Sequence, residues 1–287
     1  MYEQLDIFSS IKQPYKITKP IRLIELFAGV GSQAMALKRL GANFEHYRVV
    51  EFEKYAIKSY NAIHGTDFEP MDITKIIGSD LGISDTDKYC YIMTYSFPCQ
   101  DLSVAGKQKG MTKGSGTRSG LLWEVERLLK ESKELPQVLL MENVPQVIGK
   151  KNIGAFAEWI AFLDSLGYHS KWEVINATEY AVPQNRQRCF MVSVLGDHFY
   201  NFPKKIGNTR KLRDLLEENV PENYYLSEKI LQYFVKHTKE CEEKGQGFKF
   251  APSNGGGIAR AVTTCAGNRM DDNFVALSAT TENDLKN

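Results

Sequence analysis

The sequence predicts an α/β fold with a mostly parallel sheet, and a smaller, less regular second domain after it. From Ile21 to about Leu195, short apolar runs alternate with amphipathic stretches, the pattern of strands and helices in such a sheet. After Leu195 the residue composition changes. Lys204–Arg213 is basic, and Gly245–Gly257 is rich in glycine with few apolar positions. We therefore expect one domain over residues 1–195 and a second over residues 196–287.

The individual elements follow from these runs in chain order. Short apolar runs predict the strands Ile21–Phe27, Tyr47–Val50, Tyr91–Tyr95, Val138–Met141, Lys171–Ile175 and Cys189–Leu195. Amphipathic stretches predict the helices Ser32–Leu40, Tyr55–Ile63, Leu121–Glu131 and Phe156–Leu166. The apolar residues of Leu121–Glu131 repeat at helical spacing, so we interpret most of them as core.

The composition is that of an ordinary globular protein. Of the 287 residues, 43% are hydrophobic and 25% are charged, which is enough apolar material for a full-sized core. The formal net charge of +1 means that any polyanion must bind to a local basic surface. There is no signal peptide and no apolar run of membrane-spanning length, so we expect a cytoplasmic protein without a membrane partner. The five cysteines contain no Cys-x-x-Cys pair, so we expect neither a disulfide framework nor a metal site.

The first predicted strand runs into the turn Ala28-Gly29-Val30-Gly31-Ser32, which a helix follows. Glycines there let the backbone approach a ligand and direct free amide groups at it. Glu51 ends the next strand, where a carboxylate can accept both hydroxyls of a ribose, and Asp72 could take an adenine amino group. These residues predict an adenosine-type cofactor, either NAD or S-adenosylmethionine. Glu25 favours the second, because it would repel a pyrophosphate but could face a sulfonium or an amino group.

A cysteine follows the strand Tyr91–Tyr95. Cys99 comes after Pro98 at the carboxyl end of this strand, where α/β sheets place their chemistry. The loop Ser103–Gly120 interleaves glycines with basic residues, which favours a mobile lid that contacts a phosphate backbone. We therefore expect a reactive thiolate at Cys99. Inert buried thiols are expected at the other cysteines, Cys90, Cys189, Cys241 and Cys265.

Two further polar clusters follow predicted strands or lead into them. Glu142 stands at the carboxyl end of Val138–Met141. A half-buried carboxyl group there would hold its proton more tightly and could act as an acid. The alternative interpretation is that Glu142 caps a helix or belongs to a turn. Arg186 and Arg188 point the same way on an extended chain, so both can reach one anionic group, unless they belong to a solvated turn.

In this order and spacing, the motifs resemble those of bacterial and phage DNA (cytosine-5)-methyltransferases over roughly Ile21 to Leu195. Glu25–Gly31 is similar to the family's cofactor loop, and Pro98-Cys99-Gln100 is similar to its nucleophile motif. Arg118–Leu121 is similar to the segment that closes the catalytic loop. Glu142-Asn143-Val144 is similar to the catalytic acid motif, and Gln184–Arg188 to the arginine motif. The resemblance implies a Rossmann-like S-adenosyl-L-methionine-dependent methyltransferase domain with a smaller, irregular target-recognition domain. It also implies double-stranded DNA as the partner, in a restriction-modification system or in phage self-protection.

The resemblance assigns roles to individual residues. The cofactor would contact Phe27, Ala28, Gly29, Gly31, Ser32, Glu51, Phe52, Asp72, Ile73 and Pro98, with Glu51 on the ribose, Phe52 stacked on the adenine and Asp72 on its amino group. The catalytic residues would be Cys99, Glu142, Arg186 and Arg188. Phosphate contacts are expected from basic residues of the second domain, Lys204, Lys205, Arg210, Lys211 and Arg213.

The family's chemistry explains these residue types. Addition of the Cys99 thiolate to carbon 6 of cytosine turns carbon 5 into an enamine carbon that accepts the methyl group. Protonated Glu142 would donate to ring nitrogen 3, and Arg188 with Arg186 would hold the exocyclic oxygen. A stacked base is out of reach, so the cytosine must be flipped out at a cost of roughly a few kcal/mol.

The resemblance weakens towards the C-terminus. In the family, the recognition domain is followed by a segment that braces it and by a helix bearing Gly-Asn-Ser. In this sequence Gly267-Asn268-Arg269 matches that motif only superficially, and the end of the chain, Ser278–Asn287, is polar. We therefore expect a truncated recognition domain, with the missing motifs supplied either by a second chain or by a longer natural form of this one. The alternatives are a catalytically incomplete DNA-binding chain or split-enzyme subunit, an RNA cytosine methyltransferase, and a Rossmann-type oxidoreductase that would leave Cys99 and Glu142 unexplained.

Overall fold

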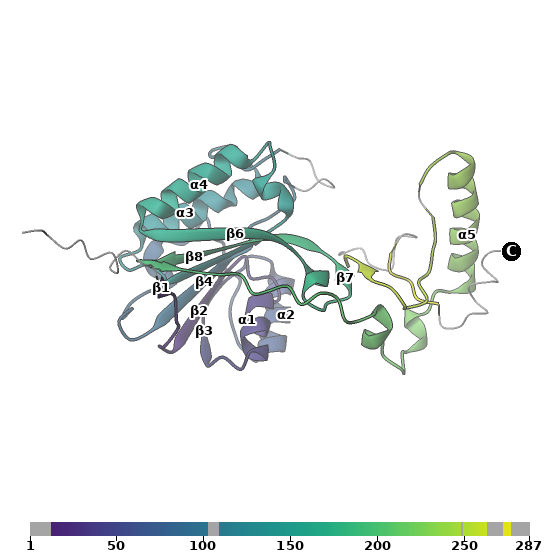
Figure 1. Cartoon of the computed structure of the whole chain (residues 1–287), viewed down its shortest axis with the longest axis horizontal. Coiled ribbons are helices and arrows are strands. Elements are labelled where there is room, and N and C mark those ends of the chain that lie inside the picture. Colours follow the sequence, from purple (N-terminus) through teal and green to yellow (C-terminus); the bar gives the residue numbers. More distant parts are fainter. Residues whose placement is uncertain (1–12, 103–108, 248, 263–271, 277–287) are drawn as a thin grey trace, which may run out of the picture. The chain divides into compact units, whose positions relative to one another are not determined.

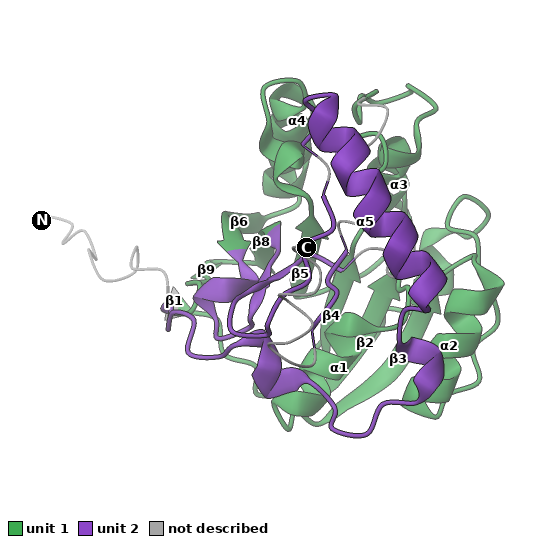
Figure 2. Cartoon of the chain, turned by 90° about the vertical axis from the view of Figure 1, so that its right-hand side faces the viewer, with its two compact units in different colours: residues 1–175, 188–203 green, residues 176–187, 204–287 purple. Residues whose placement is uncertain are grey.

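The computed structural model describes residues 13–102, 109–247, 249–262 and 272–276. Part of the predicted lid, Cys265, Gly267-Asn268-Arg269 and the polar end Ser278–Asn287 lie outside these described residues. The chain forms two compact units (Figure 2). Unit 1 contains residues 1–175 and 188–203, and unit 2 contains residues 176–187 and 204–287.

Unit 1 is built on a six-stranded sheet with the strand order β3-β2-β4-β5-β8-β6 (Figure 1). Its strands are β2 Ile21–Leu26, β3 Phe44–Val50, β4 Cys90–Tyr95, β5 Val138–Asn143, β6 Tyr168–Asn176 and β8 Gln187–Leu195. Strand β2 pairs in parallel with β3 and β4, and β4 pairs in parallel with β5, whereas β8 runs antiparallel to β5. This arrangement confirms the predicted α/β fold with a mostly parallel sheet.

Helices cover both faces of this sheet. They are α1 Ser32–Arg39, α2 Lys54–His64, α3 Leu122–Glu131 and α4 Ile153–Ser165. Figure 1 shows α3 and α4 on one face and α1 and α2 on the other. Every residue of β4 is buried, as expected for a central strand between two helical layers. The apolar residues of α3 are also buried, which confirms that they form core: Leu122, Val125, Leu128 and Leu129.

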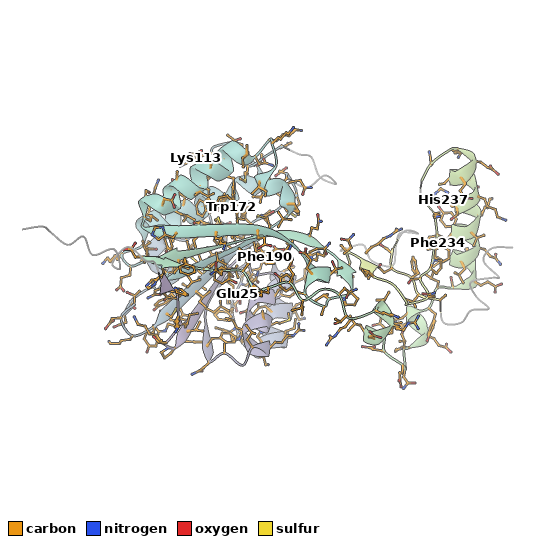
Figure 3. All side chains as sticks on the ribbon, in the orientation of Figure 1. Glu25, Lys113, Trp172, Phe190, Phe234 and His237 are labelled. Atoms are coloured by element: carbon orange, nitrogen blue, oxygen red, sulfur yellow. The ribbon has the colours of Figure 1, made fainter. Side chains whose placement is uncertain are left out.

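The described residues of unit 2 form one long helix and little sheet. Helix α5, Glu228–Glu243, begins at Ser227, whose side chain accepts a hydrogen bond from the backbone nitrogen of Ile230. Its residue Phe234 (Figure 3) packs with Phe250 and Phe274, with ring centroids 5.3 to 5.7 Å apart. Strands β7 Gln184–Asn185 and β10 Ala259–Arg260 pair in parallel. The sequence did not predict α5, because only two of its residues, Phe234 and Cys241, are buried.

Strand β1, Gln13–Pro14, pairs in parallel with β9, His198–Phe199, within unit 1. Across the part of the chain that the structure describes, no helix is both long and apolar enough to cross a bilayer. The same residues contain no cluster of three or more His, Cys, Asp or Glu side chains arranged to hold a metal ion.

Candidate active site

The turn after β2 requires its glycines. Phe27, Gly29 and Gly31 have positive φ angles of 57°, 56° and 79°, a conformation that costs a non-glycine residue such as Phe27 on the order of 1–3 kcal/mol. At Gly31 an added Cβ would lie 2.3 Å from Nε2 of His64, so no side chain fits there. Gly31 precedes α1 and makes no side-chain capping bond. The backbone nitrogen of Gly31 donates to the carbonyl oxygen of Ala28 at 2.9 Å, so it is not the free donor that the sequence predicted. At Gly29 nothing lies within 4 Å of an added Cβ, so a ligand could approach the backbone there.

Glu25 supports this turn from inside the fold (Figure 3). Its side chain is 0% exposed, and its carboxyl oxygens accept hydrogen bonds from Tyr60 Oη at 2.6 Å and from the backbone nitrogen of Ala34 at 3.3 Å. Tyr60 Oη also lies 2.7 Å from Nδ1 of His46. Burial raises the pKa of Glu25 above its ordinary value. The interpretation that Glu25 faces a bound sulfonium or amino group is therefore wrong, because its carboxyl group caps α1 in the interior.

Glu25 leads to a prediction about the pH dependence of stability. Because its pKa is raised in the folded protein, folding takes up a proton above the ordinary value of 4.5. The free energy of unfolding should therefore fall as the pH rises from there through the pKa of the folded state. Glu25→Gln should show a smaller fall when both proteins are unfolded with urea at a series of pH values. Parallel curves for the two proteins would contradict this explanation.

Hydrogen bonds join the predicted cofactor-binding segments to one another. The carboxylate of Glu51 accepts from the backbone nitrogen of Gly29 at 3.0 Å and from that of Glu53 at 2.9 Å. The carbonyl oxygen of Glu51 accepts from the backbone nitrogen of Met71 at 2.8 Å, which brings the next residue, Asp72, beside it. The glycine turn, the end of β3 and the Asp72 segment therefore form one continuous site in unit 1.

Two side chains at this site are accessible to a ligand, and a third is not. The ring of Phe52 is 71% exposed, so its face is free to stack on a planar group. Asp72 accepts from the backbone nitrogen of Thr74 at 3.0 Å and from its hydroxyl at 2.8 Å, which lowers the pKa of Asp72 and keeps it a carboxylate. Ile73 is buried in the core, so its side chain anchors the segment.

Cys99 lies on a loop that is fastened at several points. Asn143 is buried and donates through Nδ2 to the carbonyl oxygen of Phe97 at 3.0 Å. Ser119 donates through Oγ to the carbonyl oxygen of Pro98 at 2.6 Å. These bonds fix the two residues immediately before Cys99, whose own side chain is partly buried against the core.

Asp101 closes the base of the loop after Cys99, a role that sequence reasoning missed. Its buried carboxylate accepts from the backbone nitrogens of Arg118 at 2.8 Å and Ser119 at 3.4 Å, and its carbonyl oxygen accepts from the backbone nitrogen of Gly110 at 3.0 Å. The two ends of the predicted lid are therefore held together at one carboxylate. The sequence feature that could have indicated this role is an acidic residue two positions after Cys99.

Glu142 and Arg188 form an ion pair. Antiparallel pairing places Glu142 opposite Phe190, so Arg188, two residues from Phe190, lies diagonally across on the same face of the sheet. Arg188 Nε lies 2.9 Å from Oε1 of Glu142, and each side chain remains about one-fifth exposed. Arg186 belongs to unit 2, so the group assembled in unit 1 contains Arg188 without it.

The other described cysteines are buried, unlike Cys99. Burial raises the pKa of Cys189 to about 11, with a further contribution from the charge of Glu142. Burial also raises the pKa of Cys90. Both thiols are therefore poor nucleophiles at neutral pH, as expected for inert core cysteines.

In unit 2 the basic segment lies against the glycine-rich loop. The backbone nitrogen of Leu212 donates to the carbonyl oxygen of Gly257 at 3.0 Å, and that of Arg213 donates to Gly255 at 2.8 Å. A Cβ added at Gly256 would lie 2.8 Å from Nη2 of Arg213, so a glycine keeps room for the guanidinium. The predicted phosphate contacts Lys204, Lys205, Arg210, Lys211 and Arg213 are all exposed, although Lys205 pairs with Glu179 at 2.8 Å.

Comparison with known proteins relates this architecture to enzymes. The chain is 35% identical over 269 residues to the type II methyltransferase M2.ScrFI of Lactococcus lactis subsp. cremoris, covering 75% of this chain and 74% of that one. It is 34% identical over 279 residues to the orphan methyltransferase M.SssI of Spiroplasma monobiae, covering 78% and 72%. The crystal structure of the S. pombe Dnmt2 methyltransferase has the same fold, with a TM-score of 0.69 at 20% identity over 93% of this chain and 80% of that one.

A family model supplies the most direct assignment. The model of the C-5 cytosine-specific DNA methylases matches residues 21–282, which covers most of both units. Enzymes of this family act on DNA and take their methyl group from S-adenosyl-L-methionine. None of these matches bears on the second chain or on the cytoplasmic location, and both stay predictions. With a model that matches most of its length and relatives about one-third identical to it, the chain belongs to the C-5 cytosine-specific DNA methylase family.

Proposed function

We propose that this chain transfers a methyl group from S-adenosyl-L-methionine to carbon 5 of a cytosine flipped out of duplex DNA, through a covalent adduct with Cys99. The observation that carries this proposal is the fastening of the Cys99 loop to the catalytic acid segment. Asn143 donates to the carbonyl oxygen of Phe97, and the neighbouring residue Glu142 is oriented by Arg188. The adjacent residues Glu142 and Asn143 thus provide a carboxyl group and a hydrogen bond that supports the nucleophile loop.

The residues present fit the proposed cofactor. Nothing lies within 4 Å of a Cβ added at Gly29, so a ligand could approach the backbone of the turn closely at that residue. Glu51 and Asp72 offer carboxylate oxygens for ribose hydroxyls and an adenine amino group, and Phe52 offers an open ring face. The remaining predicted contacts of this site would be Phe27, Ala28, Ser32, Ile73 and Pro98. When bound, the sulfonium supplies the methyl group.

The chain's own residues would perform the other steps. The thiolate of Cys99 would form a bond to carbon 6 of the cytosine while ring nitrogen 3 takes up a proton from Glu142. For this step the Glu142 carboxylate, paired with Arg188 in the free protein, would first take up a proton from solvent. Arg188 would orient Glu142 and contact the exocyclic oxygen, a role for which Arg186 is also predicted from the sequence. After methylation, the carbon 5 proton would pass to a base such as water. The thiolate would then leave carbon 6 and ring nitrogen 3 would return its proton to Glu142, which restores the aromatic ring.

Unit 2 would bind the DNA around the target. Its exposed basic residues suit phosphate oxygens, and the adjacent Gly255–Gly257 backbone can approach a groove closely. The relatives include a type II methyltransferase and an orphan methyltransferase, which supports a role in a restriction-modification system or in modification without a partner nuclease. Methylation in phage self-protection belongs to the same proposal.

The function is tested by following tritium from labelled S-adenosylmethionine into nucleic acid. We expect incorporation into carbon 5 of cytosine in particular members of a panel of DNA duplexes, and none into RNA of the same sequences. Transfer to RNA alone would favour an RNA cytosine methyltransferase. DNA binding with no transfer to any duplex would instead favour a non-catalytic DNA-binding chain.

Glu51→Ala should weaken S-adenosylmethionine binding by about 1–3 kcal/mol, because the ribose hydroxyls would lose their charged hydrogen-bond acceptor. DNA affinity without cofactor should barely change. Isothermal titration calorimetry measures both affinities. Glu69→Ala is the matched control, since Glu69 is an exposed glutamate close to Met71 that should not touch the cofactor. Equal losses of both affinities in Glu51→Ala would count against the assignment.

A further inference from the structure

Arg127 joins the adenine side of the proposed cofactor site to helix α3. Its Nη2 donates to the carbonyl oxygen of Ile73 at 3.0 Å, and its Nη1 donates to that of Ile76 at 2.9 Å. Its Nε donates to Oε2 of Glu124 at 2.8 Å, and Nη1 lies 3.1 Å from Oε2 of Glu131. The guanidinium thus bonds two backbone carbonyls of the segment after Asp72 and two carboxylates of its own helix.

The same segment is held to α3 at a second place. The backbone nitrogen of Gly78 donates to Oε2 of Glu131 at 2.9 Å. A Cβ added at Gly78 would lie 2.5 Å from the backbone carbon of Glu131, so the two backbones approach too closely for a side chain. The side chains of Ile73 and Ile76 are buried in the core beside this contact. Residues 73–78 therefore lie along the last two turns of α3.

The first turn of α3 adjoins the base of the Cys99 loop. The short helix Arg118–Leu121 leads directly into α3, and Asp101 accepts from the backbone nitrogens of Arg118 and Ser119. One helix thus contacts the nucleophile loop at its beginning and the Asp72 segment towards its end. A planar guanidinium can bond carbonyls and carboxylates in several directions at once, which a lysine ammonium on a flexible stem does less rigidly.

We propose that Arg127 is a positioning residue for the cofactor. By bonding the carbonyl oxygens of Ile73 and Ile76, it holds Asp72 where the adenine amino group would be bound, in fixed relation to the loop that carries Cys99. Arg127 itself touches neither substrate. This inference rests on the proposed function, because it assumes that S-adenosylmethionine binds at Glu51 and Asp72.

The test compares Arg127→Met and Arg127→Lys with wild type in the full chain. For Arg127→Met we expect KM and Kd for S-adenosylmethionine to rise about tenfold, equivalent to about 1.4 kcal/mol. The kcat at saturating cofactor and the KM for DNA should stay close to wild type. Arg127→Lys should recover part of the cofactor affinity, because an ammonium can still bond one carbonyl.

The matched control is Glu124→Gln, which removes a carboxylate partner on α3 but leaves both carbonyl bonds of Arg127 in place. It should bind S-adenosylmethionine as wild type does. A lower melting temperature in Arg127→Met or Arg127→Lys with unchanged cofactor affinity would overturn the proposal, since Arg127 would then be an ordinary structural brace. If Arg127→Met does not fold, unchanged cofactor affinity in Arg127→Lys overturns it equally.

The experiment separates this inference from the function on which it rests. If wild type binds S-adenosylmethionine and Glu51→Ala weakens that binding while the Arg127 variants do not, only the positioning role fails. If wild type binds no S-adenosylmethionine at all, the proposed function fails and the positioning role fails with it.

Discussion

Cys99→Ser should abolish methyl transfer to cytosine. A serine hydroxyl is not ionised at neutral pH and is a much weaker nucleophile than a thiolate, so carbon 6 of the cytosine would not be attacked. Tritium transfer from labelled S-adenosylmethionine measures the loss directly. A duplex with 5-fluorocytosine at the target should trap wild type covalently, because fluorine cannot leave as a proton does, and should not trap the variant.

The controls for Cys99→Ser separate chemistry from folding. S-adenosylmethionine binding should stay nearly intact, since the thiol is not among the groups proposed to hold the cofactor. Cys241→Ser makes the same exchange in unit 2 and should leave both transfer and trapping unchanged. Methyl transfer at the wild-type rate by Cys99→Ser would show that the proposed mechanism is wrong.

Glu142→Gln should lower kcat by about 10²–10⁴-fold, the range that general acid catalysis supplies. Glutamine has nearly the same shape but no acidic proton for ring nitrogen 3, and it replaces the ion pair with Arg188 by a neutral contact. Rates at saturating DNA and cofactor give kcat, and calorimetry should show an unchanged Kd for S-adenosylmethionine. A variant that keeps the wild-type kcat would remove Glu142 from the mechanism.

Arg188 provides an internal check on that interpretation. If Arg188 acts mainly by orienting Glu142, the losses in Arg188→Met and Glu142→Gln should not add in the double variant, because each breaks the same interaction. Additive losses would mean that Arg188 contributes independently, through its own contact with the base.

Much of unit 1 could be predicted from the sequence because its strands are short apolar runs between amphipathic helices. The first and last residues of the strands were less predictable. Strand β3 begins at Phe44 rather than Tyr47, because a half-exposed strand mixes polar and apolar residues. The antiparallel direction of β8 could not be predicted, because it depends on which strand lies beside it in the sheet. Helix α5 was missed because a mostly exposed helix has few apolar positions.

The site shows the same division between local and long-range information. Cys99, Glu142 and Glu51 stand at the ends of strands, so their positions along the chain were informative. The hydrogen-bond partners of Glu25 and Arg127 cannot be identified from sequence position, because they lie far along the chain. Tyr60 is 35 positions from Glu25, and Ile73 is 54 positions from Arg127. Such contacts depend on the tertiary fold, and for this reason the sequence suggested an exposed role for Glu25 that the structure corrects.

Unit 2 is assembled from two separate stretches of chain. With DNA bound by unit 2 as proposed, this limits how such a protein can acquire a new specificity. Strand β7 pairs with β10, Glu179 binds Lys205, and the backbone nitrogen of Ala181 donates to the carbonyl oxygen of Gly207, so residues 176–187 are built into the same unit as the residues from 204 onward. A single recombination breakpoint near residue 204 would pair each stretch with a foreign partner. Exchange of this unit between related genes would therefore require the short stretch between β6 and β8 to be inherited together with the long one, or to evolve to match it.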